Sequence, residues 1–506
     1  MKKKVFSDIF FNILLQFSII ATGLILPRFI IGHFGSTVNG MVVSINQFLS
    51  YITLLESGIG GVIKSQLYKP LFNKDSKGIS GIVNASNGFF KKLGIIFIIY
   101  LLFIAARFKD ISSSDYDWFY IFFLVLILGI STLVQYFVGL TYQTVIQADQ
   151  HYTFTSLIQI VTLWLSVGAS ILIIYFNGSI HLVKLVAGLL FAFRPICYYF
   201  YAKSKYKLDS KTTPDTKALS QRWDGFGHHI AYFIHSNTDI VLLTIFVSLN
   251  EVSVYSVYLM VISGIRSIIS AISSAFEPYF GRLIASGKKE QLETFFGVYE
   301  LFHFFITTVL FAATLVLIIP FVRIYTAGIN DYNYIRTVFS IVIVLAELLY
   351  SFRTPYSMVI FASGHFKQTK TGAFIEAGIN IILSLILIKP LGIVGVAIGT
   401  FVAMFFRTTE YAFYLSKNIV NRPVKYYFVK TVISFFSMLG IYFLFQLIKF
   451  QPSDYLQWTL MGLLVVIVSL VVVFTVFLIG DFKNSLKLFT ILKEMLLNLK
   501  KEKNLR

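Results

Sequence analysis

The sequence predicts an all-α membrane protein that crosses the bilayer about 14 times, and three observations lead to this prediction. The chain of 506 residues is 57% hydrophobic and only 13% charged, whereas a soluble domain usually carries about 25% charged residues. Apolar stretches of roughly 18–25 residues, long enough to cross a bilayer as helices, recur from one end to the other. Lys and Arg residues concentrate in every second loop, as they do in the cytoplasmic loops of membrane proteins.

The predicted spans follow one another with short connections. Their approximate bounds are 9–31, 38–62, 92–106, 118–140, 155–176, 181–202, 227–249, 252–275, 301–323, 335–362, 374–390, 391–415, 426–449 and 456–480. The first span contains Pro27 and Arg28 and has no small-x-small cleavage site, so we interpret it as a retained helix rather than a signal peptide.

The distribution of basic residues predicts the orientation. With a cytoplasmic N-terminus, 31 of the 43 Lys and Arg residues fall in inside segments, 8 fall outside, and 4 lie within spans. Such a bias indicates an even number of spans with both termini cytoplasmic, in a bacterial inner membrane. The net charge of +19 is then a signal of topology and of contact with anionic lipids, not of nucleic-acid binding. The basic tail 481–506 predicts an amphipathic helix on the inner leaflet.

An internal repeat links the two halves of the chain. The segment Tyr142–His151 matches Tyr356–His365 at five of ten positions, with an offset of 214 residues. Arg194 and Arg407 correspond at an offset of 213. Each repeat contains six spans, and an even number keeps both halves in the same orientation. The repeat therefore predicts two parallel six-helix lobes around a central cavity that opens to alternate sides of the membrane.

These patterns predict five segments along the chain. They are an N-lobe at 1–202, a cytoplasmic interlobe loop at 203–226, a C-lobe at 227–415, two appended spans at 416–480 and a basic cytoplasmic tail at 481–506.

Several short motifs, in their order and spacing, resemble a known family over nearly the whole chain. They are Leu26-Pro27-Arg28 with Phe34-Gly35, Leu55-Glu56-Ser57-Gly58, Asn237-Thr238-Asp239 followed by Glu251–Tyr255, and Ser363–Lys367 followed by Asn380 and Leu391–Gly399. The chain resembles the Wzx-type polysaccharide flippases of the multidrug/oligosaccharidyl-lipid/polysaccharide (MATE-like) transporter superfamily. It departs from the family pattern at Glu56, where Asp is more usual, and at Ser253, where Gly is common.

The resemblance implies a function and its partners. Such a protein moves a polyprenyl-diphosphate-linked oligosaccharide from the inner to the outer leaflet, as a repeat unit of capsule, exopolysaccharide or O-antigen. Its expected partners are this glycan, anionic membrane lipids, and a polysaccharide polymerase with its export machinery. We expect no cofactor, because the sequence has no phosphate-binding Gly-x-x-x-x-Gly-Lys-Ser/Thr loop. A Na⁺ or H⁺ gradient or the membrane potential is the expected energy source.

Arginines within the spans are the candidate substrate-binding residues. A charge at the bilayer centre costs about 2.5–3.5 kcal/mol on insertion scales, so it is expected to face protein or water. Arginine suits a diphosphate because its guanidinium donates two parallel hydrogen bonds to phosphate oxygens. The five candidates are Arg28, Arg194, Arg266, Arg353 and Arg407. The alternatives are snorkelling of Arg28 to the interface and an intrahelical ion pair of Arg407 with Glu410.

Three acids within the spans are candidates for ion coupling. Asp239 lies near His235 and Asn237 in the sequence. A carboxylate with amide oxygens suits Na⁺, and an Asp with a His suits a proton relay. Glu56 and Glu347 are similar candidates. The alternative is that each carboxylate forms a structural hydrogen bond or salt bridge. We predict no metal site, because the pair His228-His229 has no Cys or further acid at ligand spacing.

Three other functions remain open at this stage. A multidrug or metabolite cation antiporter of the same superfamily would share the fold. A lipid II or teichoic-acid precursor flippase would differ only in cargo. A membrane enzyme such as a polymerase or ligase would need a catalytic outer loop, but the predicted outside loops are short and hold no acid/base constellation. We therefore expect a transporter rather than an enzyme.

Overall fold

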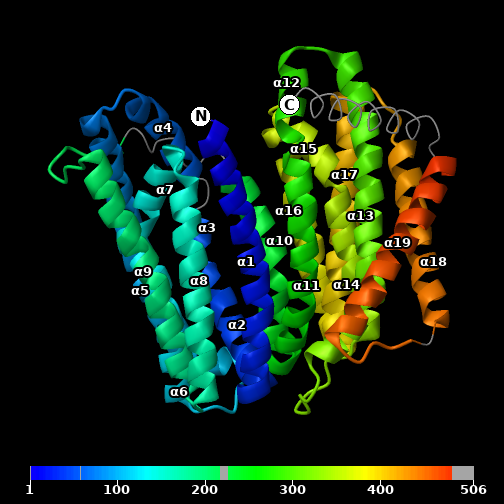
Figure 1. The fold of residues 1–506 in the computed structure, drawn as a ribbon, viewed down its shortest axis with the longest axis horizontal. Helices are drawn as coiled ribbons and strands as arrows, with labels where there is room; N and C mark the ends of the chain where they lie inside the picture. Colours follow the sequence, from blue (N-terminus) through cyan, green and yellow to red (C-terminus); the bar gives the residue numbers. More distant parts are fainter. Residues whose placement is uncertain (1, 57–58, 217–225, 449, 481–506) are drawn as a thin grey trace. The chain divides into compact units, whose positions relative to one another are not determined.

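The computed structural model describes residues 2–56, 59–216, 226–448 and 450–480, and every regular element in these ranges is a helix (Figure 1). The helices are α1 (Lys2–Phe34), α2 (Ser36–Ser50), α3 (Thr53–Glu56), α4 (Ile59–Phe72), α5 (Ser76–Ser112), α6 (Trp118–Val134), the π-helix η1 (Gln135–Gly139), α7 (Leu140–Ala148), α8 (Tyr152–Tyr175), α9 (Ile180–Tyr206), α10 (Phe226–Phe246), α11 (Leu249–Ser274), α12 (Glu277–Ala285), α13 (Lys289–Tyr325), α14 (Thr337–Phe352), α15 (Thr354–Ala362), α16 (Phe366–Leu391), α17 (Ile393–Asn418), α18 (Lys425–Leu447) and α19 (Tyr455–Gly480).

Thirteen helical segments in the described residues are long and apolar enough to cross a membrane. Each coincides with one predicted span. The remaining predicted span, 227–249, coincides with α10, in which the stretch Asn237–Phe246 is apolar. The all-α, multi-pass architecture is therefore confirmed. The amphipathic helix expected at 481–506, and residues 217–225 of the predicted interlobe loop, lie outside the described part of the chain.

Several segments predicted as loops are largely helical. Residues 63–92 belong mostly to α4 and α5, and residues 276–300 mostly to α12 and α13. Hydropathy marks only the apolar part of a helix, so polar extensions beyond the membrane are missed. The start of α5 shows a local signal for such an extension, because the Asp75 carboxylate accepts a hydrogen bond from the Gly78 backbone at 3.0 Å.

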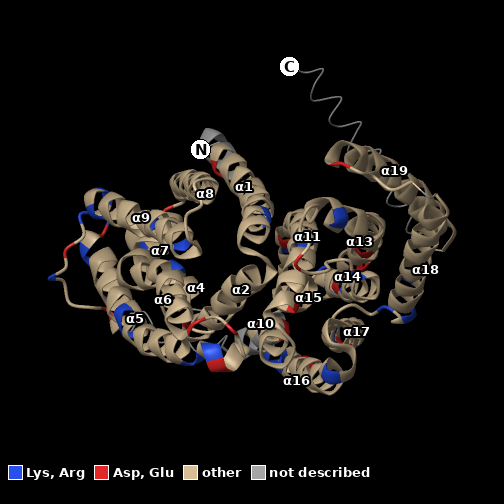
Figure 2. Ribbon diagram, turned by 90° about the horizontal axis from the view of Figure 1, so that it is seen from below, with Lys and Arg blue, Asp and Glu red and all other residues tan. Residues whose placement is uncertain are grey.

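The helix α19 shows how the exposed surface suits lipid. One face carries exposed apolar side chains, and the opposite face is buried. The exposed set includes Leu456, Leu460, Leu463, Ile467, Val471 and Phe474, and the buried set is Met461, Val465, Ser469, Val473 and Phe477. Both sets recur at three- or four-residue spacing, as expected for two faces of one helix. Charged residues are sparse along the helices (Figure 2), so most of their surface suits hydrocarbon.

The chain forms two compact units. Unit 1 contains residues 1–256 and 328–332, and unit 2 contains residues 257–327 and 333–506. The division falls within α11, and the predicted lobe boundaries remain a prediction. In unit 1, α2 packs closely on α10 and on the start of α11. The Asn39 amide donates to the Ser253 hydroxyl at 2.8 Å, and the Ser44 and Thr244 hydroxyls lie 2.7 Å apart.

The repeat found in the sequence is present in the structure of each unit. Helices α7 and α15 each have nine residues, and each is followed by a three-residue turn into the next helix. Three backbone hydrogen bonds close both turns at an offset of 214. They are Asp149 N to Val145 O, Gln150 N to Gln147 O and His151 N to Ile146 O, and the corresponding bonds from Ser363 to Val359, Gly364 to Phe361 and His365 to Ile360. The duplicated sequence thus encodes a duplicated helix–turn–helix.

The helix that precedes each of these turns is interrupted at a corresponding place. In unit 1 the interruption is η1, a single π-helical segment between α6 and α7. In unit 2 the interruption is Arg353, between α14 and α15, and Pro355 follows two residues later. Proline lacks a backbone N–H and cannot continue the hydrogen-bond ladder, and π-segments are frequent at functional sites. Both interruptions are therefore places where the backbone can position functional side chains.

Candidate functional site

An alternating array of arginines and glutamates lies in unit 2. Arg266 of α11 pairs with Glu347 of α14, with Nη1 and Oε2 3.2 Å apart. The Arg266 guanidinium carbon lies 3.9 Å from the centre of the Tyr350 ring, and that of Arg353 lies 4.0 Å from the same ring. Guanidinium groups are attracted to the negative face of an aromatic ring. Tyr350 therefore connects the two arginines without neutralising either.

The array continues through α16 and α17. Glu376 of α16 binds two arginines, because its Oε1 is 2.8 Å from Arg353 Nη1 and its Oε2 is 3.4 Å from Arg407 Nε. Arg407 also pairs with Glu410 one turn further along α17. Gly372 leaves room for that carboxylate, since a Cβ built on Gly372 would overlap its oxygens. The intrahelical pair anticipated from the sequence is thus one link of a larger array.

The three arginines of this array differ in accessibility. The side chain of Arg266 is 29% exposed, that of Arg353 is 11% exposed and that of Arg407 is 2% exposed. Within the described residues, the ion pairs of this array join three arginines to three glutamates, so their formal charges cancel. Buried charges need such compensation because their desolvation is costly. Among the three, Arg266 therefore presents the most accessible cationic surface.

A second buried charge cluster in unit 2 was missed by sequence reasoning. The Glu300 carboxylate of α13 is 2% exposed and lies 2.5 Å from Arg422 Nη1 and 2.7 Å from Lys430 Nζ. The Tyr356 hydroxyl also donates to it. The sequence prediction did not link these residues, because Arg422 falls between two predicted spans, Lys430 falls within the span 426–449, and Glu300 directly precedes the span 301–323. The signal was a glutamate directly before the apolar segment 301–323, but its partners are set by the tertiary fold.

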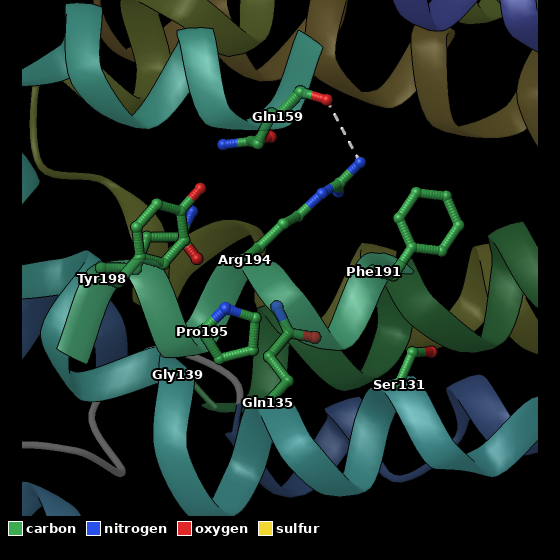
Figure 3. Close-up of a pocket in the computed structure, with 9 residues that line it drawn as sticks. Ser131, Gln135, Gly139, Gln159, Phe191, Arg194, Pro195 and Tyr198 are labelled. Atoms are coloured by element: carbon green, nitrogen blue, oxygen red, sulfur yellow. Dashed lines mark hydrogen bonds between the residues drawn. The ribbon is translucent and has the colours of Figure 1, made fainter. Parts of the chain in front are cut away.

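Arg194 lies in a cavity of unit 1 (Figure 3). The cavity has a volume of about 220 Å³ and is lined by Ser131, Gln135, Gly139, Gln143, Gln159, Phe191, Arg194, Pro195 and Tyr198. The Arg194 side chain reaches from α9 to α8, where it donates to the Thr162 hydroxyl and to the Gln159 carbonyl, the latter at 3.3 Å. Its guanidinium also lies 4.4 Å from the centre of the Phe191 ring. The structure thus places Arg194 in a polar pocket rather than in an ion pair.

The other candidates from the sequence also belong to unit 1. Arg28 of α1 is partly exposed and lies along its own helix, because a Cβ on Gly32 would be only 3.1 Å from Arg28 Nη1. Glu56 of α3 faces Tyr136 of η1. Asp239 of α10 is buried and accepts a hydrogen bond from the Tyr255 hydroxyl at 2.7 Å.

The structure therefore brings some of the predicted residues together and separates others. Arg266 and Glu347 form one pair, and Glu376 joins Arg353 to Arg407. Within the described residues, no group of three or more His, Cys, Asp or Glu side chains could hold a metal ion. The roles of these residues in substrate binding or ion coupling remain predictions.

Comparison with solved structures identifies proteins that share this fold. No protein-family model matches the chain, and no curated protein sequence matches it. A solved structure of the lipid II flippase MurJ in an inward-closed conformation is similar, with a TM-score of 0.69 and 16% identity over 94% of this chain and 100% of MurJ. The MATE multidrug transporter DinF-BH has a TM-score of 0.59 and 14% identity over 83% of this chain and 96% of its own.

A further match is an inward-facing multidrug resistance MATE family transporter of the MOP superfamily. Its TM-score is 0.52 and its identity is 14%, over 81% of this chain and 94% of that transporter. MurJ thus matches a larger share of the chain than either MATE structure does. The chain is an all-helical, multi-pass membrane protein with the fold of MurJ and the MATE transporters.

Proposed function

We propose that this protein moves a polyprenyl-diphosphate-linked oligosaccharide from the inner to the outer leaflet by alternating access, for export of a surface polysaccharide. The observation that carries the proposal is Arg266, a partly exposed arginine within a membrane-spanning helix. It lies about midway along the span Leu249–Ala285. An ionisable side chain at that depth is expensive and therefore usually functional.

The environment of Arg266 suits reversible binding of a diphosphate. Tyr350 holds the guanidinium from one side by a cation–π contact, and Glu347 neutralises it when no substrate is bound. A diphosphate accepts the same N–H groups and carries more negative charge than one carboxylate. In this mechanism the substrate competes with Glu347 for Arg266. Without substrate, Glu347 compensates the charge of Arg266, and with substrate bound, the same carboxylate helps to displace the diphosphate, so that binding is reversible.

The comparison with MurJ supports the chemical class of cargo. MurJ is described as a lipid II flippase, and lipid II, like the proposed cargo, joins a sugar headgroup to a polyprenyl diphosphate. A lipid II or teichoic-acid precursor therefore remains the second candidate cargo. The MATE structures, described as multidrug transporters, match a smaller share of the chain, and a cation carrier has less use for several arginines within the spans.

The membrane potential provides a driving force for this reaction. The cytoplasm is negative, so an anion that moves outward gains about 2.3 kcal/mol per charge for each 100 mV. A diphosphate headgroup that crossed the field would move downhill without ATP. Coupling to Na⁺ or H⁺ at Asp239, Glu56 or Glu347 would add to this force.

Reconstitution tests the proposal. The purified chain, placed in vesicles with a fluorescent polyprenyl-diphosphate oligosaccharide, should speed its translocation between leaflets. Arg266→Ala should lower the rate at least tenfold, whereas Arg266→Lys should retain part of it. Arg323→Ala is the matched control, because Arg323 is an exposed residue at the end of α13 in the same unit. An unchanged rate for Arg266→Ala would overturn the role of this arginine, and no translocation by the parent protein would overturn the function.

A further inference from the structure

Arg194 differs from the arginines of unit 2 in its charge balance. Arg266, Arg353 and Arg407 each pair with a glutamate, but among the described residues no carboxylate pairs with Arg194. Its hydrogen bonds go to a hydroxyl and a backbone carbonyl, both neutral acceptors. The residue lies at the middle of the span Ile180–Tyr206, where an unbalanced charge costs about 2.5–3.5 kcal/mol on insertion scales. Among the described residues, the positive charge of Arg194 therefore has no compensating negative charge.

The hydrogen-bonding capacity of the guanidinium is also only partly used. A guanidinium carries five N–H donors. Two hydrogen bonds, to Thr162 and to Gln159, account for the polar contacts of Arg194 in the described residues. The remaining donors are available to a ligand in the cavity, which Arg194 lines from α9 (Figure 3).

The other polar groups of the cavity are uncharged. Gln135, Gln143 and Gln159 contribute amides, and Ser131 and Tyr198 contribute hydroxyls. Gln135 is exposed although it lies near the middle of the span Trp118–Ala148. An amide exposed to hydrocarbon at that depth would lose its hydrogen bonds to water. A polar cavity that takes up a polar ligand gives these groups partners.

Backbone features shape the cavity around these side chains. Gln135 and Gly139 are the ends of η1, and the wider turn of a π-helix shifts the side chains that follow it. A Cβ on Gly139 would lie 2.6 Å from Pro195 Cβ, so glycine allows α9 to approach η1 closely. Pro195 has no N–H to donate to the Phe191 carbonyl four residues before it, and both residues line the cavity.

This combination of groups matches an acidic sugar. An amide side chain offers both donors and an acceptor, which suits the hydroxyl groups of a sugar ring. One arginine fits one carboxylate through two parallel hydrogen bonds. The volume of about 220 Å³ is below the range of about 300–1,000 Å³ typical of drug-sized ligands, so it has room for one ring rather than an oligosaccharide. Three amides beside the arginine suit ring hydroxyls, which both donate and accept, better than a diphosphate, which only accepts.

We propose that this cavity, the Arg194 pocket, binds one sugar residue that carries a carboxylate. The proposal rests on the proposed function, because the glycan of the cargo would supply this residue. It adds that the cargo contains an acidic sugar and that unit 1 recognises it through Arg194 and the three glutamines. Recognition of the diphosphate and recognition of the sugar would then be tasks of different units of the chain.

Binding of a free sugar tests the proposal without any lipid-linked substrate. Saturation-transfer NMR on the purified full-length chain in nanodiscs should detect D-glucuronate and should give at most a tenth of that signal for D-glucose. Acetate at equal concentration should not displace glucuronate. Equal signals from the two sugars would show that the charge plays no role, and displacement by acetate would show that the sugar ring plays none. Either result would overturn the proposal.

Variants locate the site. Arg194→Gln should lower the glucuronate signal at least tenfold, and Arg194→Lys should retain part of it because it keeps the charge but loses the planar fork. Gln143→Leu should weaken binding several-fold. Arg107→Gln is the matched control, since Arg107 is an exposed arginine of unit 1 outside the cavity. If Arg194→Gln does not fold, Gln143→Leu and Gln159→Leu test the site in its place. Glucuronate binding by both variants at the level of the parent protein would overturn the proposal.

The test of sugar binding and the test of lipid-linked glycan translocation can fail independently of each other. Loss of the sugar site would leave translocation of a neutral glycan on a polyprenyl diphosphate unaffected. Conversely, a chain that binds glucuronate but moves no lipid-linked glycan would keep the Arg194 pocket and contradict the flippase.

Discussion

Glu300 illustrates how much a single buried carboxylate contributes. It binds Arg422 and Lys430 at 2.5 and 2.7 Å, and the Lys430 side chain is 1% exposed. The substitution Glu300→Gln removes the carboxylate that pairs with both cations in a buried environment. Breaking a buried pair in this way costs about 3–5 kcal/mol. Thermal unfolding in detergent should therefore show a large loss of stability.

The control for this prediction lies on the same helix. Glu293 of α13 is exposed, and Glu293→Gln should change the free energy of unfolding by about 0.5 kcal/mol or less. The double substitution Glu300→Gln, Lys430→Met should recover part of the loss because it also removes one of the two cations that Glu300 balances. Equal stabilities for Glu300→Gln and the parent would show that the cluster is not a stabilising feature.

Asp149 predicts a dependence of stability on pH. Burial alone would raise the pKa of its carboxyl group. Hydrogen bonds from Lys205 Nζ at 2.7 Å and the Tyr206 hydroxyl at 2.9 Å, with the charges of Lys205 and His151, outweigh burial and hold the pKa below its ordinary value. A group whose pKa is lower in the folded state stabilises it above the unfolded pKa, about 3.9 for Asp. This contribution is lost as the pH falls through the folded pKa.

Chemical denaturation between about pH 6 and pH 3 measures this effect. The parent should lose stability in the acidic part of the range, and Asp149→Asn should start less stable and lose less, because it has no carboxylate to protonate. Parallel pH profiles for the two proteins would contradict the assignment.

Glu347 makes a prediction about transport. It competes with substrate for Arg266 in the proposed mechanism, so Glu347→Gln should tighten binding of a polyprenyl diphosphate by about three- to tenfold, a change of about 0.6–1.4 kcal/mol. Release should slow, and the translocation rate should fall although affinity rises. Direct binding and translocation assays on one preparation separate the two effects. Weaker binding by Glu347→Gln would contradict the competition.

At the scale of elements, the contact of α2 with the start of α11 depends on a single glycine. A Cβ on Gly40 would overlap the Leu249 carbonyl oxygen, which is backbone and cannot rotate away. The substitution Gly40→Ala should therefore separate these helices and destabilise unit 1 by about 1–3 kcal/mol. Gly23→Ala in α1 is the control, because nothing lies within 4 Å of the corresponding Cβ. Equal melting temperatures for the two variants would contradict this packing.

Of the two helix interruptions, the one at Arg353 has a sequence signal in Pro355, which predicts a kink, whereas η1 has none. The match between Tyr142–His151 and Tyr356–His365 predicted corresponding structures, and the backbone hydrogen bonds confirm this. The π-helix η1 lies just before the repeat segment Tyr142–His151. No sequence feature predicts it, since neither proline nor a charged residue occurs within Gln135–Gly139. Its conformation depends on packing against α9, which a local pattern does not contain.

At the scale of the whole molecule, hydropathy predicted the helical, multi-pass fold well. The apolar windows located the helices because backbone groups in lipid must be satisfied within a helix. The candidate residues were predicted as single arginines and acids, and here the sequence was less informative. It could not pair Arg266 with Glu347 or join Arg353 to Arg407 through Glu376, because each of these contacts links different helices. The Glu300 cluster was missed for the same reason.

The central claim is that the chain moves a polyprenyl-diphosphate-linked glycan outward, with Arg266 in contact with the diphosphate. The most direct test is a lipid extraction from a strain depleted of this protein, with leaflet assignment by a membrane-impermeant probe of the glycan. We predict accumulation of the lipid-linked oligosaccharide on the cytoplasmic leaflet, loss of the surface glycan, and correction by the parent gene but not by Arg266→Ala. No accumulation, together with altered tolerance to cationic drugs, would contradict the claim and favour a multidrug antiporter.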